Sequence, residues 1–408
     1  MAASVRILFL LLSGLGVFNY VFNQFLKTSI FGYVDEALLL FSFIIFGYAI
    51  LFKRYLSLLY VAVAVFLVYS VGISLAFGLS DDIPRMIGQS IINIKFFIIL
   101  IAFIVLFKDH IGELRKFFTI ILTIAVIGIA LHLLMGYAFN KFFYISRYLR
   151  PHVRYTGFFR HPNHLAYFAV IYITLVLNSF KVRQLNISTL GWIKLALGLL
   201  VIILADTRTA MLATAILLTG FYWDYIYKNI IVFFSFIFLG LTAVFCILLF
   251  TDLPDTIMRN ISMSYSLDTH YIRGLMFYMS ILIFYQYFPI GTGAGTFGSY
   301  FSFGSQVYKD FGVSDRYYFV NEMGIYDSNF ASILGEYGLM GIIMYYLLFK
   351  FTLRHMRFKS IQKRNPSMLK PLLWVFIFFC ISNPMITNSV YIILSVVGFL
   401  LIAKTEVE

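Results

Sequence analysis

The sequence predicts an all-α, polytopic membrane protein with about twelve transmembrane helices. Of its 408 residues, 61% are hydrophobic and only 12% are charged, whereas a soluble domain is roughly 45–50% apolar and about 25% charged. Apolar runs recur from end to end, at the roughly 17–25 residues that a helix needs to cross the hydrocarbon layer. We expect a single transmembrane domain over residues 1–408, with outer-face loops at 140–163 and 252–330.

The expected spans are separated mostly by short polar connections. The first apolar run has no small-residue cleavage site before a polar region, so we interpret it as a retained span and not as a signal peptide. The expected spans are residues 5–25, 35–52, 56–78, 91–107, 117–139, 164–180, 189–205, 209–227, 229–251, 331–350, 370–386 and 388–404.

Basic residues predict the orientation of these spans, because Lys and Arg are enriched on the cytoplasmic side of membrane proteins. The basic connections all fall on one side if both termini are cytoplasmic. The strongest of them is 350–370, with seven Lys and Arg residues and no acid. The net charge of +13 is therefore explained by topology and does not indicate nucleic-acid binding.

Residues 274–290 are apolar enough to form a further span. A crossing there would move the basic run 350–370 to the outer side and reverse the strongest orientation signal. We therefore expect an interfacial or re-entrant helix at 274–290, where Tyr278, Tyr285 and Tyr287 suit the level of the lipid headgroups.

The outer side carries a second basic cluster, which the orientation rule does not explain. Residues 147–164 contain no acid. One interpretation is that its arginines bind lipid phosphates. The other is a diphosphate site, because guanidinium groups bind phosphate oxygens in pairs and the helix predicted to begin near Pro162 favours an anion. The candidate binding residues of this segment are Arg147, Arg150, Arg154, Arg160, His161 and Asn163.

Two short polar motifs are expected on the same side. Arg208 follows Asp206 in a tight turn between two spans, where the pair forms either a local ion pair or part of a functional site. Arg273 and His270 precede the interfacial helix. His270 is a candidate acid or base, or simply a surface residue.

A third motif leads into the span at 331–350. Asp327 is a candidate base that takes a proton from a sugar hydroxyl, and the alternative is that Asp327 or Ser328 caps the helix. Tyr326 and Asn329 flank it as candidate binding residues. Glu336, about two turns into the span, needs a partner, and we expect an external arginine.

Several other chemistries find no support in the sequence. The glycine-rich stretch 289–297 superficially suggests a phosphate-binding loop, but no strand precedes it, and a flexible chain reversal is the preferred interpretation. No His, Cys, Asp and Glu set has metal-ligand spacing, and no serine lies in a nucleophile turn. We expect no cofactor and no metal.

The order of these motifs resembles the O-antigen polymerase and O-antigen ligase family of bacterial envelope glycosyltransferases. The resemblance covers roughly residues 150–345. It is carried by Arg154-x-x-Gly157-x-Phe159 with Pro162-Asn163, Thr207-Arg208-Thr-Ala, Arg273 before Pro289-x-Gly291-x-Gly293, and Asp327-x-Asn329 before Gly338-x-x-Gly341.

This resemblance implies a metal-independent enzyme at the outer face of the bacterial cytoplasmic (inner) membrane. Its substrate would be an undecaprenyl-diphosphate-linked oligosaccharide within the membrane lipids, with a chain-length regulator and a flippase as further partners. Arg154, Arg208 and Arg273 would hold the diphosphate leaving group.

The ligase branch typically has a His-Asn pair where this chain has Tyr326-Asp327-Ser328-Asn329. We therefore favour a polysaccharide polymerase, for O-antigen, capsule or exopolysaccharide, with Asp327 as the base and His270 as the second candidate. The alternatives are an O-antigen ligase that transfers glycan to lipid A-core and a lipid-linked oligosaccharide flippase. A flippase would typically show two related halves, and the sequence shows none.

Overall fold

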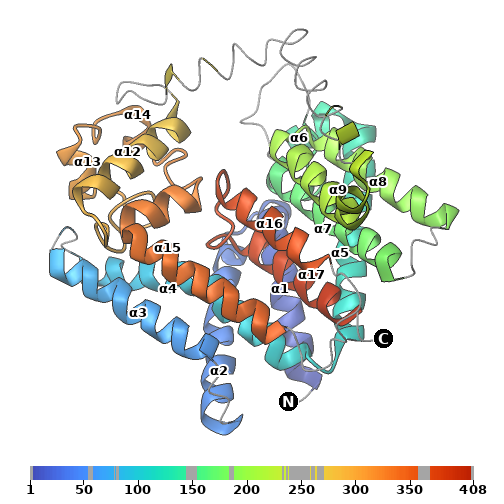
Figure 1. The fold of residues 1–408 in the computed structure, drawn as a ribbon, viewed down its shortest axis with the longest axis horizontal. Helices are drawn as coiled ribbons and strands as arrows, with labels where there is room; N and C mark the ends of the chain where they lie inside the picture. Colours follow the sequence, from blue (N-terminus) through green and yellow to red (C-terminus); the bar gives the residue numbers. More distant parts are fainter. Residues whose placement is uncertain are drawn as a thin grey trace.

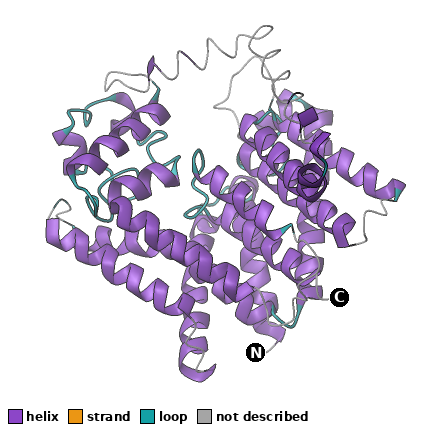
Figure 2. Cartoon of the chain, in the orientation of Figure 1, coloured by secondary structure: helices purple, strands orange, loops and turns teal. Residues whose placement is uncertain are grey.

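The structure is a computed structural model of the chain (Figure 1). It describes residues 3–53, 58–77, 79, 82–143, 154–182, 188–231, 234–235, 238, 258, 262–263, 271–356 and 368–405. These residues form helices and loops, and no strand occurs among them (Figure 2).

The helices follow the order of the expected spans. In chain order they are α1 (Ala3–Phe25), the 3-10 helix η1 (Ile30–Tyr33), α2 (Val34–Lys53), α3 (Leu58–Phe77), α4 (Ile83–Phe107), α5 (Ile111–Met135), α6 (Tyr137–Phe143), α7 (Pro162–Val182), α8 (Thr189–Ala205), α9 (Arg208–Lys228), α12 (Ile272–Gln286), α13 (Gln306–Asp310), α14 (Tyr317–Val320), α15 (Asn329–Met356), α16 (Leu369–Cys380) and α17 (Ser389–Thr405).

The all-helical membrane architecture is confirmed, but the count of twelve spans is not. Within the described residues, seven helices are long and apolar enough to cross a membrane: α1, α2 with its preceding turn, α3, α4, α5, α7 and α15. The apolar helices α8, α12, α16 and α17 are shorter. Most of the span expected at 229–251 lies outside the described residues.

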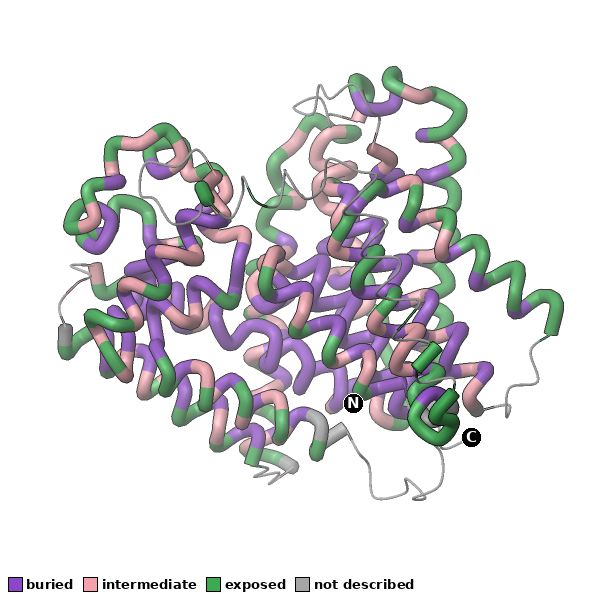
Figure 3. The backbone as a smooth tube through the Cα atoms, turned by 45° about the horizontal axis from the view of Figure 1, so that its top comes forward, coloured by how far each residue is buried: buried purple, intermediate pink, exposed green. Residues whose placement is uncertain are grey.

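Two helices form the centre of the molecule. Residues 389–403 of α17 are all buried, and α17 packs against α1, α4, α5, α7 and α16. Most of α4 is buried as well, between α2, α3 and α17. A helix that is hydrophobic all round belongs in such an interior position, and the buried residues in Figure 3 gather there.

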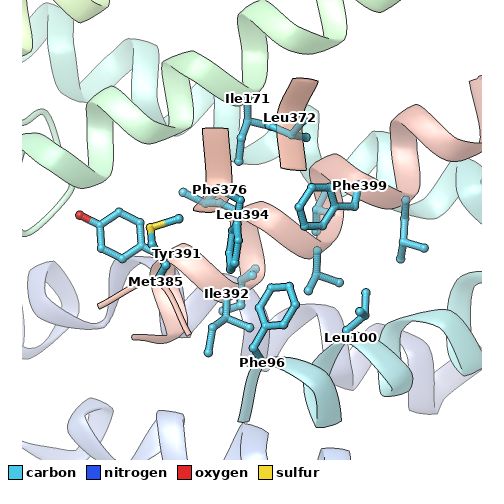
Figure 4. Close-up of a cluster of buried hydrophobic side chains, with 14 of the residues drawn as sticks. Phe96, Leu100, Ile171, Leu372, Phe376, Met385, Tyr391, Ile392, Leu394 and Phe399 are labelled. Atoms are coloured by element: carbon cyan, nitrogen blue, oxygen red, sulfur yellow. The ribbon is translucent and has the colours of Figure 1, made fainter. Parts of the chain in front are cut away.

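Close packing holds this centre together. Phe376 of α16 lies with its ring centroid 4.9 Å from that of Phe96 on α4 and 5.9 Å from that of Phe399 on α17 (Figure 4). A Cβ on Gly398 would lie 2.9 Å from Cγ2 of Ile171 on α7, so a larger residue there would have to displace the Ile171 side chain. Small residues have this role in membranes, where helix association depends on packing because lipid is as apolar as the protein core.

Helix ends follow local sequence signals. Pro162 is the first residue of α7, as its fixed φ predicts. Asp82 caps α4 by accepting a hydrogen bond from the Arg85 amide, and Ser188 caps α8 in the same way from the Gly191 amide. The α4 helix thus begins eight residues before the expected span at 91, because its capped first turns are polar.

The helix expected at 274–290 exists as α12. With 15 residues it is about 22 Å long, which is shorter than the roughly 30 Å hydrocarbon layer. It packs against α15 and shares a separate hydrophobic cluster with the loop and short helices that follow it. These contacts place α12 in a cap beside the main bundle (Figure 1).

Candidate functional site

The connection between α16 and α17, residues 381–388, contacts the first residues of other helices; we call it the hub turn (Figure 1). Its Asn383 Oδ1 accepts a hydrogen bond from Asn163 Nδ2 at 2.8 Å, at the start of α7. Its Ile386 amide donates to Asn329 Oδ1 at 2.8 Å, at the start of α15. Helices α7, α15 and α17 therefore begin around one turn.

Two more helices begin nearby. Thr209 Oγ1, in the first turn of α9, lies 3.4 Å from Ser382 Oγ in the hub turn. Arg273, in the first turn of α12, binds Asp327, which comes two residues before α15. The first turns of helices carry free N–H groups and a partial positive charge. Their convergence makes this end of the bundle suited to an anion.

The ion pair between Arg273 and Asp327 joins the cap to α15. Arg273 donates from Nη2 at 3.1 Å and from Nε at 3.3 Å, both to Asp327 Oδ2. The side chains are 43% and 35% exposed. The helix cap is made instead by Ser328, whose Oγ accepts a hydrogen bond from the Ala331 amide at 3.2 Å. Asp327 is therefore not needed as the cap.

Of the two interpretations of the Asp206 and Arg208 motif, the local ion pair is not formed. Asp206 Oδ2 lies 3.4 Å from Arg154 Nε, on a segment 52 residues away. Helix α8 ends at Asp206 and α9 begins at Arg208, and residues two apart do not face each other at a helix end. Arg208 is exposed and makes no ion pair within the part of the chain that the structure describes.

Three arginines lie around His161. Burial lowers the pKa of His161 to about 4, and the positive charges of Arg273, Arg154 and Arg160 act in the same direction. His161 is therefore neutral near pH 7, and its Nδ1 accepts a hydrogen bond from the Asn163 amide at 3.2 Å. In a neutral imidazole the other nitrogen carries the proton, so His161 is a donor at Nε2 and not a base.

Glu336 has different partners from those expected. It is fully buried, and no arginine is bonded to it among the described residues. Its Oε1 accepts hydrogen bonds from the Gly295 amide at 2.8 Å and the Thr296 amide at 3.2 Å, and from Ser299 Oγ. Its Oε2 accepts from Asn93 Nδ2 at 3.1 Å. Backbone amides and neutral donors thus take the place of the expected ion pair.

These contacts also explain the glycine-rich stretch after α12. Its amides bind a carboxyl group, as the amides of a phosphate loop bind a phosphate, and that group belongs to the chain's own Glu336. Gly293 has φ +96°, and a Cβ there would lie 2.7 Å from Ser74 Cα. The Ala294 amide donates to Ser74 Oγ at 2.6 Å. The stretch does reverse the chain, but several contacts fix it in place.

The structure brings together most of the predicted site residues. Arg154, Arg160, His161 and Arg273 form one cluster, and Asp327 is bonded to it through Arg273. Asn163 and Asn329 bind the hub turn. Arg208 precedes Thr209, which contacts the hub turn, and Tyr326 lies within electrostatic range of Arg160 and Asp327. The predicted residues Arg147, Arg150 and His270 lie outside the described residues.

Sequence reasoning missed two features of this region. One is Asn383, to which no role was assigned and which accepts a hydrogen bond from Asn163. The other is Lys95 on α4, which is 4% exposed and whose Nζ lies 2.5 Å from Asp35 of α2. Asp35 also accepts a hydrogen bond from Ser389, the first residue of α17. The available signal was a charged residue inside an expected span, which usually marks function or a buried partner.

The fold and this cluster define a class of protein: a polytopic helical membrane protein with a basic site where several helices begin. A model of the O-antigen ligase family matches residues 193–346, from α8 into α15, which include Arg208, Arg273 and Asp327. This match supports the O-antigen ligase/polymerase family that the motifs suggested. The match and the apolar helices together support an enzyme of the glycan ligase/polymerase type in a bacterial membrane. No curated protein matches the chain.

Proposed function

We propose that the protein is a polysaccharide polymerase that transfers a glycan from undecaprenyl diphosphate onto a lipid-linked repeat unit at the outer face of the cytoplasmic membrane. The observation that carries this proposal is the group of Arg154, Arg160 and Arg273 around neutral His161. Asp206 and Asp327 each pair with one of these arginines, but Arg160 leaves the group with an excess of positive charge, which is suited to a diphosphate. Phosphate-binding arginines can supply the charge stabilisation that a metal supplies elsewhere.

The proposed reaction breaks one bond and forms one. A hydroxyl oxygen of the acceptor sugar attacks the anomeric carbon of the donor glycan, and the bond from that carbon to the diphosphate oxygen breaks. Undecaprenyl diphosphate leaves with an additional negative charge. Arg154, Arg208 and Arg273 stabilise that charge, together with the N-terminal ends of α7, α9 and α15.

Asp327 is the proposed base for the acceptor hydroxyl. Its Oδ2 is held by Arg273, and this ion pair leaves Oδ1 to approach the hydroxyl. A carboxylate in such a position typically contributes about 10²–10⁴ in rate. His161 is a poorer choice, because its Nδ1 already accepts the Asn163 amide. A protonated Nε2 suits a hydrogen bond to a phosphate oxygen instead.

The residues before α15 favour one branch of the family. We favour the polymerase because this chain has Tyr326-Asp327-Ser328-Asn329 where ligases typically have a His-Asn pair. A ligase would use the same donor and transfer the glycan to lipid A-core. The acceptor therefore distinguishes the two, and both acceptors belong in one assay.

The test is elongation by the purified protein in nanodiscs with an undecaprenyl-diphosphate-linked oligosaccharide. We expect a ladder of longer lipid-linked products that EDTA leaves unchanged. Arg208→Ala should lower the rate by about 10²–10³, and Asp327→Asn should lower it by a similar factor. Arg115→Ala is the matched control, because Arg115 is exposed near the start of α5, at the opposite end of the bundle.

Two results would contradict the proposal. Transfer to lipid A-core without elongation would replace the polymerase with a ligase. No transfer to either acceptor, together with movement of the lipid-linked oligosaccharide across liposome membranes, would replace the enzyme with a flippase.

A further inference from the structure

Tyr300 is an exposed aromatic residue on a fixed loop. Of its surface, 61% is exposed. The residues on either side are anchored: Ser299 donates its hydroxyl to Glu336, and the Phe301 amide donates to Gln89 Oε1 at 3.2 Å. A surface tyrosine on a mobile loop would lose conformational entropy on binding a ligand, whereas a fixed loop has already incurred that cost.

Tyr326 forms a pair with Tyr300 and connects it to the candidate site. The ring centroids are 6.2 Å apart and the planes meet at 58°. Burial raises the pKa of Tyr326, the charges of Glu322 and Asp327 raise it further, and Arg160 opposes them. Tyr326 therefore lies within electrostatic reach of both Asp327 and Arg160. The tyrosine pair extends from the catalytic region to the surface of the cap.

A sugar ring matches such a surface chemically. One face of a pyranose presents C–H groups with partial positive charge, and the face of an aromatic ring is negative. A phenolic hydroxyl both donates and accepts hydrogen bonds, as sugar hydroxyls do. Because the two tyrosine rings meet at an angle, one ring can stack on the face of a sugar while the other contacts the edge of the same sugar or of the next one.

We propose that Tyr300 and Tyr326 form a binding subsite for the acceptor carbohydrate, with one sugar ring stacked on Tyr300 and its reactive hydroxyl directed to Asp327. This inference rests on the proposed function and adds the recognition of the acceptor. The donor diphosphate occupies the arginine cluster, so the sugar next to Asp327 on the side of the cap belongs to the acceptor. The proposed subsite contacts the carbohydrate of the acceptor and makes no contact with its lipid.

The competing explanation for an exposed tyrosine is an anchor at the membrane interface. Tyr285 on α12 is of that kind, because it is 77% exposed and its ring pairs with Phe284 next to it. The Tyr300 ring also contacts its sequence neighbour, Phe301, but Tyr300 differs because both of its neighbours are anchored and its ring pairs as well with Tyr326, next to Asp327. Tyr285 therefore provides the matched control for Tyr300.

The test measures acceptor recognition with and without turnover. The probe is the free oligosaccharide released from the lipid-linked substrate used for elongation, so it carries neither lipid nor diphosphate. Its dissociation constant is measured directly on protein in nanodiscs. The KM for the acceptor and kcat are measured in the elongation assay with the donor saturating.

We expect Tyr300→Ala to weaken binding of the free oligosaccharide and to raise the acceptor KM, each by about tenfold, with kcat within about twofold. Tyr300→Phe should keep most of the affinity because the stacking face remains, and Tyr285→Ala should match the wild type. The KM effect without a kcat effect separates recognition from a general structural defect.

The inference would be overturned if Tyr300→Ala bound the oligosaccharide as the wild type does, or if Tyr285→Ala had the same effect. Failure of the proposed function gives a different result. In that case the wild type elongates no lipid-linked substrate, whereas direct binding of the oligosaccharide still reports on the tyrosine pair.

Discussion

At the scale of single residues, the surroundings of His161 determine its charge. The free side chain titrates near 6.5, but here burial and the neighbouring Arg273, Arg154 and Arg160 lower the pKa to about 4. A charged imidazole would repel these arginines and compete with them for the diphosphate. The site therefore has a hydrogen-bond donor that stays neutral over the physiological range.

This shift predicts how stability depends on pH. Between about pH 6.5 and 4 the unfolded chain binds a proton at His161 and the folded chain does not. Acidification across this range should therefore lower the free energy of unfolding, while above pH 6.5 the contribution of His161 is constant. We expect His161→Gln to reduce the drop in the unfolding midpoint between pH 7.5 and 5. The control is His110→Gln, at an exposed position; equal slopes for the wild type and His161→Gln would contradict the assignment.

At the scale of elements, the loop after α12 is fixed by a carboxylate on α15. Glu336 binds amides of that loop with one oxygen and Asn93 of α4 with the other, so three separate parts of the chain meet there. The sequence showed a buried acid but not its partners, because Glu336 and Gly295 are 41 residues apart. Hydropathy and periodicity carry no information on such distant pairs.

This arrangement predicts a rescue. In Glu336→Gln the new amide group would place a second donor opposite Asn93 Nδ2. A buried donor without an acceptor costs about 1–3 kcal/mol, so the unfolding midpoint and the elongation rate should both fall. Adding Asn93→Asp replaces the opposing donor with acceptor oxygens, and we expect it to recover most of the lost stability. A double variant no more stable than Glu336→Gln alone would show that the contact does not hold the loop.

At the scale of the whole molecule, apolar run lengths were enough to predict where most helices lie. They gave the wrong helix boundaries where a helix end is surrounded by protein and not by lipid. Helix α4 begins at Ile83 and not at 91, because its first turns bury polar residues such as Gln89 against the cap. Helix α16 ends at Cys380 and not at 386, because the following residues form the hub turn.

The arrangement of the whole molecule also shows which part of the site could be predicted. Orientation signals placed 140–163, the turn at Asp206 and 252–330 on one side. The described parts of these segments meet at one end of the bundle, where the hub turn also lies. The partners within that group were not predictable. Arg154 with Asp206, and Asn163 with Asn383, are contacts between distant segments.

If this end of the bundle binds a diphosphate, the protein must have affinity for the leaving group itself. Binding of undecaprenyl diphosphate and undecaprenyl phosphate would be compared on the wild type, Arg208→Ala, Arg273→Ala and Arg115→Ala in nanodiscs. We predict that the wild type and Arg115→Ala prefer the diphosphate. Each site variant should weaken diphosphate binding by about tenfold or more, since charge-assisted hydrogen bonds contribute about 1.5–3 kcal/mol. Equal affinities for the two lipids, or site variants that bind the diphosphate as the wild type does, would contradict the account.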